Sequence, residues 1–207
     1  MSIDLPKTFN PTDSTEVAGR PQIFDPALKH YSRAFRPGDP TFASPEAAAR
    51  WHASRRLATD HVLRALAASP WGEYLVLRGS RLMKAWFGDA AREPGDLDYV
   101  VTAAGAKPAD PWAAKLLSGV AAAVGARPRP RGVAFQMQHM ATDDIWTYER
   151  AEGRRIVFPW HAPYAPGGAV QVDVVFGETL AETPTQAAIP TADGDAVSVL
   201  AATAGES

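Results

Sequence analysis

The sequence predicts an α+β fold in which a mixed β-sheet is backed by helices. Short apolar runs, typical of buried strands, alternate with segments of helical periodicity, and glycine or proline separates the two kinds of segment. No internal repeat is present, and 207 residues suffice for one ordinary domain. We therefore expect a single folded domain of mixed secondary structure.

An N-terminal arm is predicted to precede this domain. Residues 1–43 contain six prolines and show little hydrophobic periodicity, which is typical of an extended segment. The domain itself, residues 44–207, begins with a helix. Ser44 suits the N-cap of this helix, Pro45 suits its first position, and the periodic pattern ends near Ser69.

The next segments alternate between strand and helix. A buried strand is expected at 74–77, followed by Gly79-Ser80, a helix over 81–87 and a strand at about 97–102. A second long helix follows Asp110-Pro111, runs over 113–124 and is ended by Gly125.

The last third of the chain is predicted to be mainly β-structure. We expect strands at about 133–138, 144–149 and 154–159, with a turn at Glu152-Gly153 between the last two, and a clear strand at 170–176. Residues 201–207 are interpreted as the start of a further helix.

Composition narrows the function classes. The chain has no cysteine, which excludes disulfides and thiolate zinc sites and fits a cytoplasmic location. No signal peptide and no membrane-spanning run is apparent, so no membrane partner is expected. The net charge of −2 gives no overall attraction to nucleic acid, so RNA binding would need a local basic patch.

Two aspartates separated by one residue are the strongest functional signal. Asp96 and Asp98 open the strand expected at 97–102, and alternation along a strand directs both to the same face. Neighbouring carboxylates raise each other's pKa unless a positive charge lies between them. Oxygen ligands of this kind suit Mg²⁺ or Mn²⁺.

A third acid lies on the last predicted strand. Asp173 is surrounded by apolar residues, and a lone carboxylate there is costly unless it is ion-paired or binds a metal. If this strand lies beside that of Asp98, the three carboxylates converge and could hold two metal ions about 4 Å apart. A structural salt bridge of Asp173 is the alternative interpretation.

Gly79 and Ser80 suit a phosphate-binding turn. Glycine allows close approach of the backbone to a phosphate, and the N-terminus of the following helix offers free N–H groups. Cations near this turn could neutralise charge as pyrophosphate leaves; they are Arg78, Arg81, Lys84 and Arg92.

In this order of motifs the chain resembles the DNA polymerase β-like nucleotidyltransferases. Those enzymes have a Gly-Gly or Gly-Ser turn, then Asp-x-Asp, then a third acid on a later strand, as Gly79-Ser80, Asp96-Leu97-Asp98 and Asp173 have here. Within them it looks most like the AbiEii/AbiGii toxins of type IV toxin–antitoxin systems, in which an arginine precedes the first aspartate by four residues, as Arg92 does. The resemblance covers about 74–176.

The resemblance implies a Mg²⁺- or Mn²⁺-dependent transfer of a nucleoside monophosphate from an NTP, such as ATP, to an acceptor hydroxyl. Asp96, Asp98 and Asp173 would be the metal ligands and catalytic residues, with Asp173 also the base for the acceptor. Gly79 and Ser80 would hold the triphosphate, with Lys84 and Arg92 in support. The acceptor would be a tRNA 3′ end and the partner an antitoxin protein; small molecules and protein hydroxyls are alternative acceptors.

The chain departs from the family pattern in two ways. Pro94-Gly95 replaces the serine or threonine that often stands two residues before the first aspartate. The helical C-terminal half of the family is not recognisable, so we expect a C-terminally truncated domain. A catalytically silent module that binds a nucleotide or a partner is therefore the alternative, and a metal-dependent phosphodiesterase is a third.

The sequence also offers one candidate basic patch. It could contact RNA phosphates, although a pair of solvated loops is the favoured interpretation. Its members are Arg127, Arg129, Arg131, Arg154 and Arg155.

Overall fold

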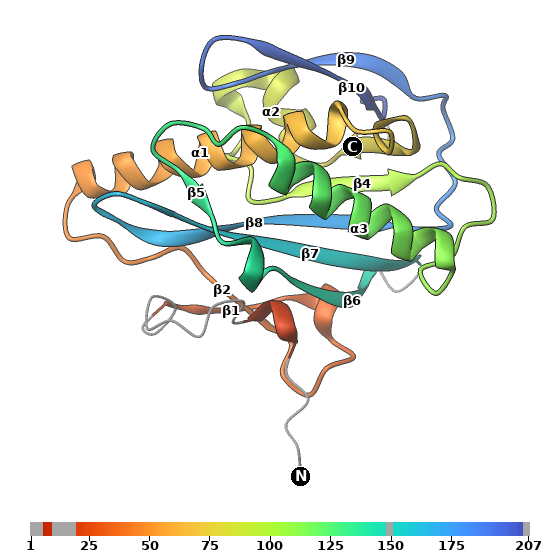
Figure 1. Ribbon diagram of the computed structural model, residues 1–207, viewed down its shortest axis with the longest axis horizontal. Coiled ribbons are helices and arrows are strands. Elements are labelled where there is room, and N and C mark those ends of the chain that lie inside the picture. Colours follow the sequence, from red (N-terminus) through yellow and green to blue (C-terminus); the bar gives the residue numbers. More distant parts are fainter. Residues whose placement is uncertain (1–5, 10–19, 148–150, 205–207) are drawn as a thin grey trace.

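A twisted mixed β-sheet with helices on it forms the body of the protein (Figure 1). The computed structural model describes residues 6–9, 20–147 and 151–204. Within these, no helix is long and apolar enough to cross a membrane. The α+β class predicted from the sequence is confirmed.

Seven strands form the main path of the sheet, in the order β5-β7-β8-β4-β3-β10-β9, and β6 pairs with β7 beside this path. β4 runs parallel to β8, and β10 parallel to β3, whereas the other pairs are antiparallel. The strands are β3 (Leu75–Arg78), β4 (Leu97–Val101), β5 (Ala134–Phe135), β6 (Ala141–Thr147), β7 (Ala151–Ala162), β8 (Ala165–Val175), β9 (Thr185–Pro190) and β10 (Ala196–Ala201).

Three helices pack on this sheet. α1 (Pro45–Ala67) begins at Ser44, whose hydroxyl accepts a hydrogen bond from the Ala47 amide at 3.3 Å, as an N-cap serine should. α3 (Pro111–Ala126) lies beside α1 in front of the sheet, and α2 (Ser80–Phe87) lies near β9 and β10 (Figure 1). All three helices lie where the sequence predicts them, within about two residues at each end.

Alternation along the strands separates an apolar face from a charged one. Leu97, Tyr99, Val172 and Val174 are buried in one core together with residues of α1 and α3. The residues that alternate with them on β4 and β8 include Asp98 and Asp173, which therefore point to the opposite face of the sheet.

The N-terminal arm packs against the charged face instead of remaining irregular. It contains two short antiparallel strands, β1 (Gln22–Phe24) and β2 (Phe35–Pro37), and a 3₁₀ turn at Pro26–Leu28. Leu28 and Ala34 of the arm form a small core with Ile145 of β6. Residues 20–43 of the predicted arm thus have local structure, which this apolar contact supports.

Three predictions of secondary structure are wrong. Residues 201–204 are not helical; β10 ends at Ala201, and the Ala202 amide donates to the Leu77 carbonyl at 2.9 Å. Glu152 and Gly153 lie within β7 and form no turn. Glycine is needed there for packing, because a Cβ on Gly153 would lie 2.9 Å from Ile145 Cγ1.

The strand expected at 133–138 is also shorter than predicted, since a 3₁₀ turn at Met137–His139 follows β5. The connection between β6 and β7, residues 148–150, lies outside the described residues.

Candidate functional site

The two aspartate-bearing strands are neighbours, as the candidate site requires. β4 and β8 pair in parallel, and Asp98 and Asp173 are direct partners in the register. Asp96 lies in the bend just before β4 and is half-buried. The fold therefore brings the three acids that the sequence singles out to the same end and the same face of the sheet.

A row of alternating charges crosses this face over five strands. The register aligns Arg78 of β3 with Asp98, Asp98 with Asp173, Asp173 with Arg155 of β7, and Arg155 with Asp143 of β6. Side chains directly opposite each other on neighbouring strands lie close enough to interact. Within the row, Asp98 and Asp173 are the one pair of adjacent like charges.

Asp98 is the most perturbed of the acids at the surface of the site. Burial and the neighbouring carboxylates of Asp96 and Asp173 together raise the pKa of its carboxyl to about 8, although Arg78 and Arg155 act in the opposite direction. A carboxyl in such surroundings favours either a proton or a cation. This is the electrostatic signature expected of a cation-binding carboxylate.

The Gly79-Ser80 turn lies directly against Asp98. Gly79 has φ +72°, in the region that L-residues avoid, and a Cβ at this position would lie 2.4 Å from Asp98 Oδ2. Glycine is thus required both for the backbone conformation and for space. Ser80 begins α2, and its hydroxyl donates to Asp96 Oδ1 at 3.3 Å. The turn and the acids therefore form one continuous site.

Asp173 is held by a buried ion pair. Arg155 donates to its two oxygens from Nε and Nη2, each at 2.8 Å, and the two residues are 3% and 6% exposed. Arg155 also donates from Nη1 to Asp25 Oδ2 of the arm at 2.6 Å. The salt bridge considered from the sequence for Asp173 is therefore present, and its partner is Arg155.

The hydrogen bonds of Asp173 leave little capacity for a ligand. A carboxylate has about four lone-pair sites. Oδ2 accepts from Arg155 and from Gln171 Nε2 (3.2 Å), whereas Oδ1 accepts, among the described residues, from Arg155 alone, which leaves one site on Oδ1. Among the described residues, no group of three or more His, Cys, Asp or Glu is arranged to hold a metal ion. Asp96 and Asp98 fit a divalent cation by charge, with Asp173 able to contribute one oxygen at most.

The predicted supporting cations differ in their surroundings, and some pair with acids outside the site. Lys84 pairs with Asp89 at 3.3 Å and with Glu93 at 4.0 Å, and Arg92 is exposed in the loop before β4. Arg78 instead pairs with Glu178. The roles of Lys84 and Arg92 stay predictions.

The candidate basic patch is not continuous. Arg155 is 3% exposed and ion-paired, and Arg154 pairs with Asp144 at 2.6 Å on the other side of β7. Arg127, Arg129 and Arg131 lie in the loop after α3. A surface patch containing Arg155 is therefore wrong, because that side chain is almost fully buried and is paired with Asp25 and Asp173.

Sequence reasoning missed the residues that support Asp173. Arg155, Asp25 and Gln171 surround this acid, yet Asp25 lies 130 residues before Arg155 in the chain. The one available signal was Asp173 itself, because a carboxylate in an apolar strand demands a partner. No local pattern indicates which arginine supplies it.

Comparison with known proteins agrees with this geometry. No curated protein matches the chain. The family model described as nucleotidyl transferase AbiEii toxin, type IV TA system, matches residues 61–206, which include the Gly79-Ser80 turn and all three acids. The chain therefore belongs to the AbiEii family of nucleotidyl transferase toxins of type IV toxin–antitoxin systems.

Proposed function

We propose that this chain transfers a nucleoside monophosphate from an NTP to an acceptor hydroxyl, with Mg²⁺ or Mn²⁺ as cofactor. The observation that carries the proposal is the register pairing of Asp98 with Asp173, directly against the Gly79-Ser80 turn. A turn suited to phosphate beside clustered carboxylates is the arrangement that phosphoryl transfer needs, because its catalysis consists mainly of positioning and charge neutralisation.

The residues have distinct proposed tasks. Asp96 and Asp98 would hold the divalent cation, which when bound neutralises charge on the phosphates. The amides at the start of α2 and the Ser80 hydroxyl would hold the triphosphate. Asp173 would accept the proton of the acceptor hydroxyl on Oδ1, the oxygen with spare capacity. Arg155 would fix the orientation of that carboxylate.

The family supports the partner and the donor, and the acceptor is part of our proposal. Nucleotidyl transferase toxins of type IV systems imply an antitoxin protein as partner and a nucleotide as substrate. We propose a tRNA 3′ end as the acceptor. Its terminal ribose supplies the hydroxyl, and no particular NTP is favoured by the residues of the site.

Transfer of label tests this proposal. The purified protein is incubated with each α-³²P NTP, Mg²⁺ and total tRNA, beside Asp98→Asn and the matched variant Asp195→Asn. Asp195 is an exposed carboxylate outside the site, so this control should keep activity. Label in tRNA with the wild type and Asp195→Asn, but not with Asp98→Asn, supports the proposal; equal labelling by all three contradicts it.

A catalytically silent binding module is the second candidate, and the Arg155–Asp173 ion pair favours it. Both oxygens of Asp173 are already engaged, and an occupied carboxylate suits a structural role. In that case Asp98→Asn would leave nucleotide or partner binding unchanged, and the wild type would transfer no label under any metal. Calorimetric titration with NTP measures the binding directly.

A further inference from the structure

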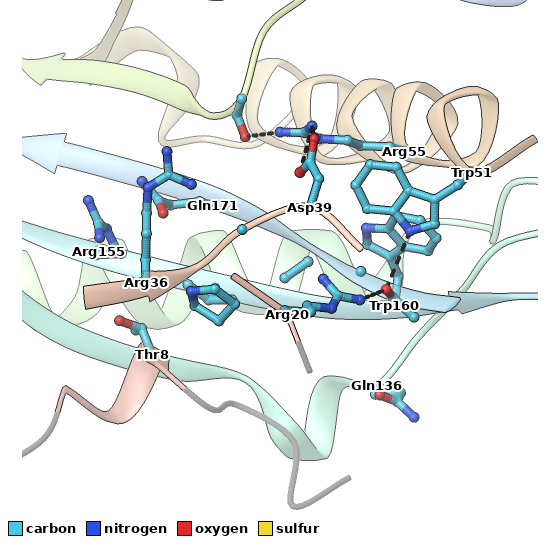
Figure 2. Close-up of a pocket in the computed structure, with 17 residues that line it drawn as sticks. Thr8, Arg20, Arg36, Asp39, Trp51, Arg55, Gln136, Arg155, Trp160 and Gln171 are labelled. Atoms are coloured by element: carbon cyan, nitrogen blue, oxygen red, sulfur yellow. Dashed lines mark hydrogen bonds and ion pairs between the residues drawn. The ribbon is translucent and has the colours of Figure 1, made fainter. Parts of the chain in front are cut away.

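A small pocket lies between the N-terminal arm, α1 and the β7–β8 pair, next to the candidate site (Figure 2). The arm contributes Arg36 of β2, α1 contributes Trp51 and Arg55, and β7 contributes Arg155 and Trp160. In the view of Figure 2, Arg36, Gln171 and Arg155 lie at one side of the pocket and the two tryptophans at the other. The roles proposed above do not include a ligand of this pocket.

The pocket wall carries mainly positive charge. Four arginines line it, namely Arg20, Arg36, Arg55 and Arg155, against the single carboxylate of Asp39. Arg55 is held by Asp39 and by the Gly95 carbonyl, and Arg155 by Asp25 and Asp173. Arg36 is the most available of them, since its side chain is 41% exposed and its ion pair with Asp25 is long, at 3.7 Å.

A further donor is buried in the wall. Trp160 is 1% exposed, and its indole N–H has no hydrogen-bond partner within the described part of the chain. Buried polar groups normally have a partner, yet this nitrogen is covered by the protein, so a ligand in the pocket does not reach it. The guanidinium groups of the wall are donors only, so the ligand that they fit is an anion.

The size of the pocket limits what can enter it. Its cavity volume is about 90 Å³. Pockets that enclose a whole drug-sized ligand measure roughly 300–1,000 Å³, so a nucleotide does not fit inside. The space suits one tetrahedral anionic group attached to a larger molecule outside.

The position of the pocket indicates which larger molecule carries this anionic group. Its lining includes Gly95, which directly precedes Asp96, and Gln171, which donates to Asp173. It therefore borders the acids from the β7–β8 side, whereas the Gly79-Ser80 turn approaches Asp98 from β3. A phosphate in the pocket would belong to a strand that reaches the acids from the side opposite the bound triphosphate.

We propose that this pocket binds a backbone phosphate of the nucleic-acid acceptor strand, with Arg36 as its main ligand. This inference rests on the proposed transfer reaction, because that reaction makes the bound strand an acceptor. The binding itself needs neither metal nor turnover. Arginine is well suited to this task, because its planar group pairs with two phosphate oxygens at once.

Binding of a 5′-fluorescein-labelled single-stranded RNA without divalent cation tests the pocket, by fluorescence anisotropy at several salt concentrations. Arg36→Gln should weaken binding about tenfold and reduce the salt slope by about 0.7, the value for one phosphate contact on a single strand. Arg36→Lys keeps the charge and should restore part of the affinity. Arg56→Gln is the matched control, because Arg56 lies on α1 with an exposed ion pair to Glu93.

The outcomes separate this inference from the proposed reaction. Unchanged RNA binding by Arg36→Gln contradicts the proposal that the pocket binds an RNA phosphate, even if the wild type labels tRNA. Weaker NTP binding with normal RNA binding also overturns it, since the anion would then be the triphosphate. Weaker RNA binding by Arg36→Gln, with Arg56→Gln unchanged, supports it even if no label is transferred, a result that would contradict only the proposed reaction.

Discussion

At the scale of single residues, several features of the candidate site lower the stability of the folded protein. Asp98 is directed against Asp173 in the register and stands beside Asp96, so the folded protein holds like charges together. Gly79 adds a backbone conformation that other residues avoid. Costs of this kind persist where the surrounding structure imposes them, and they concentrate at functional sites.

The raised pKa of Asp98 predicts an unusual pH dependence of stability. Its ordinary value is 3.8, and burial with the nearby acids raises it to about 8 in the folded protein. Between these values the folded state binds more protons than the unfolded state, so this group lowers stability as the pH rises from about 4 to 8. Asp98→Asn should therefore raise the free energy of unfolding at pH 8, by on the order of a few kcal/mol.

Urea unfolding without divalent cation at pH 5 and pH 8 measures this effect. The advantage of Asp98→Asn over the wild type should shrink at pH 5, where the wild-type carboxyl is protonated in the folded state. Adding Mg²⁺ at pH 8 should stabilise the wild type more than the variant. An identical pH dependence of the two proteins would contradict the raised pKa.

Gly79→Ala should damage the site beyond its cost to the backbone. Gly79 (φ +72°) would bring a Cβ within 2.4 Å of Asp98 Oδ2, whereas Gly132 (φ +80°) has no atom near its own added Cβ. Gly132→Ala therefore reports the cost of a side chain at a positive φ with open space around it, about 1–3 kcal/mol. The unfolding free energy of Gly79→Ala should fall further than this, and its transfer activity should be lost. Equal losses in the two variants would show that Asp98 moves aside freely.

At the scale of elements, Arg155 joins the arm to the centre of the sheet. It links Asp25 before the Pro26–Leu28 turn to Asp173 on β8, and all three side chains are buried. Removing one partner of a buried ion pair leaves an uncompensated charge. The arm is thus held by an interaction that also positions a candidate catalytic acid.

Arg155→Met should destabilise the protein by about 3–5 kcal/mol, because Asp25 and Asp173 lose their common partner. The neighbouring Arg154→Met is the control, since the Arg154–Asp144 pair is partly exposed and such pairs contribute about 0–1 kcal/mol. Chemical denaturation of both variants gives the comparison. Similar losses would mean that the buried pair is no stronger than the exposed one.

The sequence predicts the local elements better than the long-range partners. Helix α1 was predictable from Ser44-Pro45, and the Asp96–Asp98 motif from strand alternation, because both depend on neighbours in the chain. β9 was missed because its segment holds only one large apolar residue, Ile189. β10 was missed although Val197 and Val199 alternate with polar or small residues and Asp193-Gly194 is a typical hairpin signal. The Asp25–Arg155 contact was not predictable, because nothing local pairs residues so far apart.

At the scale of the whole molecule, the arm and the sheet share one charged layer. Asp143 of β6 accepts hydrogen bonds from the Lys7 amide (3.0 Å), the Thr8 amide (2.6 Å) and the Tyr31 hydroxyl (3.2 Å). Burial raises the pKa of Tyr31 to about 12, with the charge of Asp143 adding to the effect. Asp143 and Arg155, on neighbouring strands, are therefore two of the polar anchors of the arm's described parts.

We expect the arm to open before the core does, because its apolar contact with the sheet is small. The described parts of the arm share a small apolar cluster with β6, whereas α1, α3 and the central strands share the large core. Regions with few buried apolar contacts open locally at a lower free energy than global unfolding.

Asp143→Ala removes the acceptor of three hydrogen bonds and should increase amide exchange at Thr8 and in β2, while Val172 and Val174 of β8 stay protected. Asp144→Ala, one residue along and facing solvent, should change neither region. Hydrogen–deuterium exchange read by mass spectrometry resolves the two, and equal loss of protection in β2 and β8 would show instead that the arm and the sheet unfold as one unit.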